Sequence, residues 1–332
     1  MKKRFVTILQ YTFFFLLGLL FVWLTLKDVN KSQWLNIKSA VLNARQWVIF
    51  PVILMILLSH FSRAIRWKIL MEPLGYNPST FNTFAAVMIG YLVNAGVPRL
   101  GEVVKCTLLS RYENVRADKL VGTIVVERAF DAFCLLLVFI MTMFIEGNVI
   151  GEYTLNMARG FVEDESGNIS IIKILTVIAG IFIIIFLIYH LLKRFGHVDA
   201  VAKFKNVLYG IWLGLNSFRF IKNKAAFLFH TLFIWAMYLF STTAGLYALR
   251  ETDHLGIGVG LATLVIGSVG MIVTPGGIGA YPWLIEKLMG LYHVTEETGK
   301  TLGWLLWSAQ TVIILLGGVI CFALITYYNK KK

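Results

Sequence analysis

Charged residues are scarce in this sequence. They make up 15% of its 332 residues, where soluble domains carry about 25%. Hydrophobic residues reach 58%, and the mean hydropathy is +0.74. Several stretches of roughly 17 to 29 residues hold no charge at all, which is the length that crosses a bilayer as a helix. The composition excludes a soluble globular fold, because too little polar chain remains to cover these stretches.

Cysteine and metal-binding motifs are scarce as well. The three cysteines, Cys106, Cys134 and Cys321, stand at scattered positions and indicate neither a disulfide framework nor a metal site. The six histidines form no His-Glu-x-x-His spacing, and no Gly-rich phosphate loop is present. We therefore expect no metal, no cofactor and no direct use of ATP. The net charge of +13 is explained by basic loops on one side of a membrane, so nucleic acid is not expected as a partner.

The long apolar runs predict an all-α polytopic membrane protein. The first run, at 5–26, is too long for the apolar region of a signal peptide and no small-residue cleavage site follows it, so we interpret it as a retained span. The runs are 5–26, 46–62, 73–98, 120–145, 174–192, 225–249, 255–285 and 301–329.

Loop charges predict the orientation, because Lys and Arg accumulate in cytoplasmic loops. Basic residues dominate the N-terminus, the loop at 193–224 and the C-terminal tail, whereas the loop at 147–170 holds one Arg and four acidic residues. We expect both termini and the loop at 193–224 in the cytoplasm and 147–170 outside, in a cell inner membrane. The spacing in 198–220 predicts an amphipathic helix on the cytoplasmic leaflet within that linker.

The same charges make two runs re-entrant. A first hairpin, about 80–118, enters from the cytoplasm and turns at 94–101, and a second, about 257–292, enters from outside and turns at 274–279. If either run crossed fully, a basic loop would lie outside or the acidic loop inside. The prediction is about six full spans plus two hairpins, arranged as an inverted-topology repeat of 1–146 and 171–332, separated by the loop at 147–170.

Five charged residues at membrane depth are the candidate site. Arg99 lies at the tip of the first hairpin and Glu102 stands three residues after it, whereas Glu127, Arg128 and Asp131 lie inside the run at 120–145. Such charges usually pair or line a pathway. One interpretation is that Arg99 and Arg128 bind a lipid phosphate, with the three carboxylates as counter-ions. The other is a structural network that joins the hairpin to the span.

Arg63, Arg66 and Lys105 are weaker candidates. Arg63 and Arg66 flank the end of the run at 46–62 beside Trp67, so the pattern favours snorkelling anchors at the cytoplasmic face. A role in headgroup access is the minority interpretation for these three residues.

Four motifs in order resemble the lysylphosphatidylglycerol synthase transmembrane-region family. They are Arg63-Ala-Ile-Arg-Trp67, Asn94-x-x-x-Pro98-Arg-x-Gly101-Glu102, Glu127-Arg-x-x-Asp131 and Pro275-Gly-Gly-Ile-Gly279. This is the flippase-like membrane half of the multiple peptide resistance factor, which also occurs alone. The resemblance implies substrate-binding roles for the signature positions Asn94, Pro98, Arg99, Gly101, Glu102, Glu127, Arg128, Asp131, Pro275, Gly276, Gly277 and Gly279.

The sequence departs from the family at two positions. Pro282 stands where members often carry an acidic residue, and Lys105 where they often carry Arg. The first departure puts an acid-coupled role of the second hairpin in doubt. No soluble transferase domain follows the membrane part, so aminoacyl transfer, and enzyme activity in general, is not expected.

The resulting hypothesis is a lipid transporter of the flippase or scramblase type. It would move an anionic phospholipid or a polyprenyl phosphate, with ion coupling through Glu102, Glu127 or Asp131 left open. An intramembrane enzyme acting on lipid headgroups and a scaffold for an envelope-lipid synthase are the alternatives. Expected partners are lipids with anionic headgroups, and a homo-oligomer or envelope-synthesis enzymes are further candidates.

Overall fold

A computed structural model describes residues 31–97, 99–149 and 217–330, with a few single positions before residue 31. Every regular element in these ranges is a helix. Three of them have the length and apolar composition to cross a membrane: Gln46–Leu74, Lys224–Leu246 and Glu296–Lys330. These findings confirm an α-helical membrane protein. The predicted spans at 5–26 and 174–192, most of the external loop and most of the cytoplasmic linker lie outside the described residues.

The helices follow the apolar runs, with their ends set by caps and turns. Ser79 begins α4 by accepting a hydrogen bond from the Asn82 N–H at 3.5 Å, and Asn223 begins α10 by accepting one from the Ala226 N–H at 3.0 Å. The bounds are α2 Lys31–Asn43, η1 Gln46–Val48, α3 Ile49–Met71, η2 Glu72–Leu74, α4 Thr80–Gly96, α5 Leu100–Glu113, α6 Ala117–Ile145, η3 Ser217–Phe220, α10 Lys224–Leu246, α11 Ile257–Val273, η4 Pro275–Gly277, α12 Ala280–Leu291 and α13 Glu296–Lys330.

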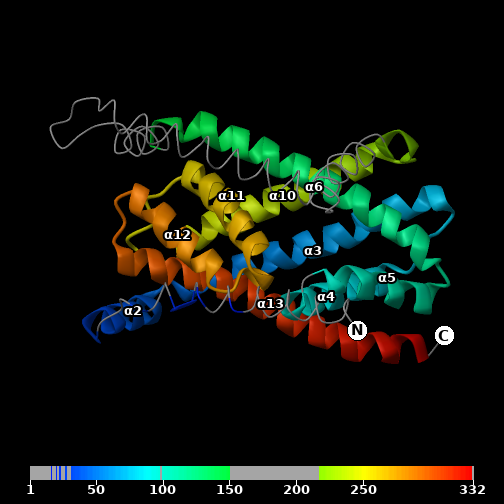
Figure 1. The fold of residues 1–332 in the computed structure, drawn as a ribbon, viewed down its shortest axis with the longest axis horizontal. Helices are drawn as coiled ribbons and strands as arrows, with labels where there is room; N and C mark the ends of the chain where they lie inside the picture. The colour runs from blue at the N-terminus through cyan, green and yellow to red at the C-terminus, as the bar shows by residue number, and fades with distance from the viewer. Residues whose placement is uncertain are drawn as a thin grey trace, which may run out of the picture.

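The helix α3 runs through the middle of the bundle and carries several of the charges discussed below (Figure 1). It packs against α10 on one side and α4 on the other. It continues through Met71, well past the predicted end at 62, because its basic residues Arg63 and Arg66 have acidic partners inside the bundle.

Two helical hairpins lie toward opposite ends of the long axis of the molecule (Figure 1). One pair is α4 with α5 and the other is α11 with α12, and the members of each pair pack against each other. The long helix α13 lies along both, since it contacts α4 and α12. This arrangement directs the turn of each pair toward the centre of the bundle.

Candidate functional site

The turn between α4 and α5, which is the first of the two predicted turns, is stabilised by Asn94 and by the close approach of Gly90 and Gly101. Arg99, which precedes α5, has φ 66° and provides no side-chain cap. The Gly101 N–H instead donates to Asn94 Oδ1 at 2.8 Å, so a residue of α4 caps the start of α5. A Cβ on Gly101 would collide with the Gly90 carbonyl oxygen. Asn94 and Gly101 therefore hold the two helices together.

The second turn, between α11 and α12, contains three glycines with positive φ: Gly276, Gly277 and Gly279. Side chains satisfy its exposed backbone. The Thr274 hydroxyl donates to the Ile278 carbonyl at 2.9 Å, and Trp307 Nε1 of α13 donates to the Gly276 carbonyl at 2.8 Å. Broken backbone of this kind is tolerated at membrane depth where protein surrounds it.

The two turns touch. The short helix η4 contacts α4, and a Cβ built on Gly276 would lie 3.5 Å from the Ala95 Cα. Pro98, a predicted site residue in the first turn, lies outside the described residues. Pro275 and the glycines of the second turn thus shape a meeting point of the two hairpins.

Beside the first hairpin lies a buried charge cluster of Arg63, Arg66, Lys105, Glu127 and Asp131. Arg63 Nη1 contacts Glu127 Oε1 at 2.8 Å and Asp131 Oδ2 at 2.5 Å. Arg66 Nη2 contacts Asp131 Oδ1 at 2.7 Å, and Lys105 Nζ contacts Glu127 Oε2 at 3.0 Å. The cluster joins α3, α5 and α6.

This cluster corrects two expectations from the sequence. Arg63 and Arg66 do not snorkel to an interface: their side chains are 6% and 0% exposed, and they pair with carboxylates of α6. Glu127 and Asp131 therefore pair with Arg63, Arg66 and Lys105, whereas one of the two interpretations of the sequence made them counter-ions of Arg99 and Arg128.

Arg128 and Glu102 form a separate, more exposed pair. Arg128 Nε contacts Glu102 Oε1 at 3.0 Å, and the two side chains are 43% and 31% exposed. The contact uses only the Nε of Arg128, and within the described ranges no hydrogen bond or ion pair joins its two terminal nitrogens to the protein. Arg99 is exposed at the tip of the first hairpin.

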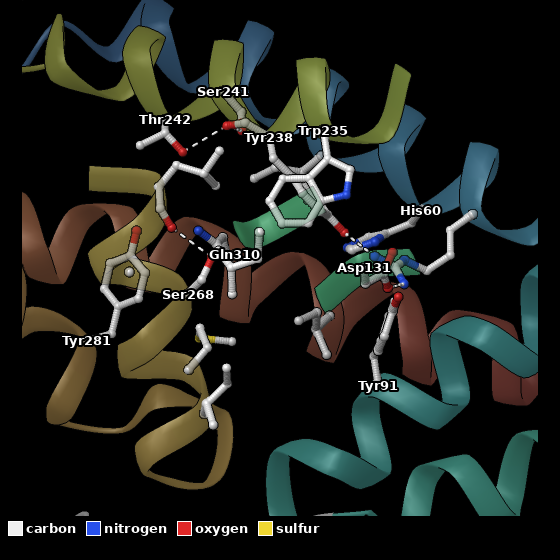
Figure 2. A pocket seen from close by; sticks show the side chains of 18 of the residues that line it. His60, Tyr91, Asp131, Trp235, Tyr238, Ser241, Thr242, Ser268, Tyr281 and Gln310 are labelled. Atoms are coloured by element: carbon white, nitrogen blue, oxygen red, sulfur yellow. Dashed lines mark hydrogen bonds and ion pairs between the residues drawn. The ribbon is translucent and has the colours of Figure 1, made fainter. Parts of the chain in front are cut away.

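A cavity of about 480 Å³ opens beside the cluster, lined by residues of α3, α4, α6 and α10–α13. Arg63, Arg128 and Asp131 are the predicted site residues that line it. Figure 2 shows His60, Tyr91 and Asp131 gathered on one side of the cavity, with Tyr281, Ser268 and Gln310 on the other. The rest of the wall is mostly apolar, and its most open member, Ile272, is 74% exposed at the end of α11.

Several lining residues could not be recognised from the sequence. His60, Tyr91, Trp235 and Tyr238 are single polar side chains in apolar runs, without a motif spacing. Tyr238 is tied to the cluster, because Arg63 Nη2 donates to its hydroxyl at 3.3 Å. Within the described ranges, no group of His, Cys, Asp and Glu side chains has a geometry that could hold a metal ion.

Comparison with known proteins identifies the family. The sequence model of the family described as the lysylphosphatidylglycerol synthase TM region matches residues 9–318. The chain belongs to this family. A relative, the UPF0104 membrane protein MJ1595 of Methanocaldococcus jannaschii, is 30% identical over 202 residues. That match covers 57% of this chain and 56% of the relative, so the chain spans about half the length of the curated relative that it matches. No solved structure matches the chain.

Proposed function

We propose that this member of the family moves lipids with an anionic headgroup between the two leaflets of a membrane, as a flippase or scramblase. The substrate would be an anionic phospholipid or a polyprenyl phosphate. The observation that carries the proposal is the cavity, which combines Arg63, Arg128 and Asp131 at one end with a largely apolar wall. A lipid has the same division between a charged head and apolar chains.

The charge of the site favours an anion. Arg63, Arg66, Lys105 and Arg128 provide four cations, and Glu102, Glu127 and Asp131 provide three carboxylates, which leaves one positive charge in excess. A bound phosphate would neutralise this excess. Arg128 is the group best placed to bind it, because its terminal guanidinium nitrogens are available beside the cavity and guanidinium is suited to phosphate.

The arrangement of the hairpins supports a route through the bundle. The pairs α4–α5 and α11–α12 lie at opposite ends of the long axis, and their turns meet near the cavity (Figure 1). In the proposed topology, about six helices span the inner membrane, both termini are cytoplasmic, and the two hairpins re-enter from opposite faces as parts of an inverted repeat. Opening the bundle at one hairpin and then at the other would expose the cavity to each side in turn.

The topology has a direct test by cysteine labelling. In a background without the native cysteines, Asn114→Cys after the first hairpin and Thr295→Cys after the second report the two sides. A membrane-impermeant thiol reagent should label Asn114→Cys only from the cytoplasmic side and Thr295→Cys only from outside. Labelling of both positions from the same side would rule out the opposed hairpins.

The transport activity is tested with Arg128→Gln in vesicles that contain a fluorescent anionic lipid. A charge-assisted hydrogen bond contributes about 1.5–3 kcal/mol, so the variant should slow movement of the lipid at least about tenfold. Its pair with Glu102 is partly exposed and contributes only about 0–1 kcal/mol to folding, so the protein should remain intact. The control is Arg116→Gln, which removes an exposed pair with Asp118 and should leave transport unchanged.

Two outcomes would contradict the proposal. One is wild-type protein that moves no anionic lipid, and the other is Arg128→Gln moving it at the wild-type rate. Mass analysis of the lipids from the same vesicles separates transport from the enzymatic alternative, because an enzyme acting on the headgroup would change the lipid mass.

A further inference from the structure

The cavity contains buried polar nitrogens that have no hydrogen-bond partner among the described residues. Both ring nitrogens of His60 and the Nε1 of Trp235 make no hydrogen bond within the described part of the chain. Both residues line the cavity, and His60 is 6% exposed. Buried polar groups are almost always hydrogen-bonded, and leaving one unpaired costs free energy. These nitrogens are therefore candidates for hydrogen bonds to a ligand.

They belong to the charged end of the cavity. The His60 ring lies 4.9 Å from the Tyr91 ring, and the Trp235 ring lies 6.2 Å from the ring of Tyr238, whose hydroxyl accepts a hydrogen bond from Arg63. Figure 2 shows His60 and Trp235 both projecting into the cavity from different helices. A headgroup whose phosphate binds Arg128 would place its remaining atoms among these side chains.

Among the described residues, the cavity offers no unpaired carboxylate to an ammonium group. Both oxygens of Asp131 are paired with arginines, and both oxygens of Glu127 are paired with Arg63 or Lys105. Glu102 is paired with Arg128 through Oε1 and does not line the cavity. A headgroup that carries an amine would bring a second cation to a site that already has one positive charge in excess.

We propose that the cavity selects a phosphodiester lipid whose headgroup carries hydroxyls and no amine. The inference deepens the proposed function and rests on it. The single negative charge of a phosphodiester matches the excess of one positive charge, whereas a phosphate monoester carries roughly −1.5 to −2. A neutral imidazole has one donor and one acceptor nitrogen, and a hydroxyl satisfies both types, while Trp235 donates to a second oxygen.

The experiment compares lipids that differ only in the headgroup. Dissociation constants for purified protein in detergent are measured for phosphatidylglycerol, phosphatidylethanolamine and phosphatidic acid with identical acyl chains. Phosphatidylglycerol should bind at least about tenfold more tightly than phosphatidylethanolamine, since the amine lipid lacks a counter-ion here and its charge would be left unpaired. Phosphatidic acid, which lacks the hydroxyls, should bind more weakly than phosphatidylglycerol.

Variants assign the selectivity to the two side chains. His60→Phe and Trp235→Phe keep an aromatic ring and remove the ring nitrogens. Each should weaken phosphatidylglycerol binding about fivefold, the equivalent of one hydrogen bond, with phosphatidic acid binding unchanged. Trp304→Phe is the control, because Trp304 Nε1 is also buried without a partner in the described ranges but does not line the cavity. Phosphatidylglycerol should bind this variant as tightly as it binds wild type.

Equal affinities for phosphatidylglycerol and phosphatidylethanolamine would overturn the inference. So would wild-type affinity for phosphatidylglycerol in both His60→Phe and Trp235→Phe. If anionic lipid still moved in vesicles in either case, the proposed function would stand without the selectivity. If selective binding were found without lipid movement, the recognition site would be supported and the transporter proposal would fail.

Discussion

The buried charge cluster makes a prediction about stability that concerns Glu127. Its carboxylate is fully buried and contacts Arg63 at 2.8 Å, Lys105 at 3.0 Å and Arg66 at 3.8 Å. The substitution Glu127→Gln leaves these cations with Asp131 as the remaining carboxylate of the cluster. Removing one partner of a buried ion pair costs about 3–5 kcal/mol. At about 2–4 °C per kcal/mol, the apparent Tm in detergent should fall by roughly 10 °C.

The size of this loss should depend on Lys105. The double variant Lys105→Met with Glu127→Gln removes one cation together with one anion and restores the net charge of the cluster. The second substitution should therefore recover about 1–3 kcal/mol, the usual coupling between residues of one network. The matched control is Lys300→Met, since Lys300 is also buried but pairs with Glu296 at 2.7 Å in a different part of the bundle. The loss of stability caused by Lys300→Met should simply add to that caused by Glu127→Gln, without any recovery.

The measurement is the loss of monodisperse protein on heating, for the wild type, the single variants and both double variants. A Glu127→Gln protein as stable as the wild type would refute the cluster described above. If adding Lys105→Met to Glu127→Gln lowered the melting temperature further, where a partial recovery is expected, the count of one excess positive charge at the anion site would be wrong.

Three further predictions concern the hairpins. Gly101→Ala should lower the free energy of unfolding by about 3 kcal/mol, because its Cβ would collide with the backbone of Gly90. Gly96→Ala has open space around it and should change stability little. Equal melting temperatures for the two variants would contradict the close packing. Asn94→Ala should cost about 1 kcal/mol through loss of the cap of α5, with an unchanged melting curve as the contrary result. Gly276→Ala should cost about 1–2 kcal/mol because of its φ of 60°, and normal stability of the variant would indicate a different backbone there.

The positions at which the helices break could be predicted from the sequence. The turn expected at 94–101 contains the end of α4 and the start of α5, and the turn expected at 274–279 contains η4. Both predictions rest on local chemistry, since Pro and Gly interrupt an apolar helix wherever it packs. The predicted ranges 225–249 and 301–329 also agree closely with the bounds of α10 and α13. The reason is again local, because a long apolar run forms a helix whatever it packs against.

The partners of the charged residues could not be predicted in this way. Arg63 and Glu127 are separated by 64 residues, and only the packing of α3 on α6 brings them together. From local sequence, two arginines at the end of an apolar run resemble interface anchors. Likewise, His60 and Trp235 are isolated polar residues on separate helices, and their shared cavity depends on how those helices cross.

We propose above that this protein moves anionic lipids across a bilayer. The most direct measurement reconstitutes the purified chain in vesicles and follows the accessibility of a fluorescent phosphatidylglycerol in the inner leaflet to an external quencher. If the protein moves this lipid, quenching should exceed the half expected from the outer leaflet, and the excess should grow with the number of protein molecules per vesicle. Quenching that stays at the level of protein-free vesicles at every protein density would contradict it.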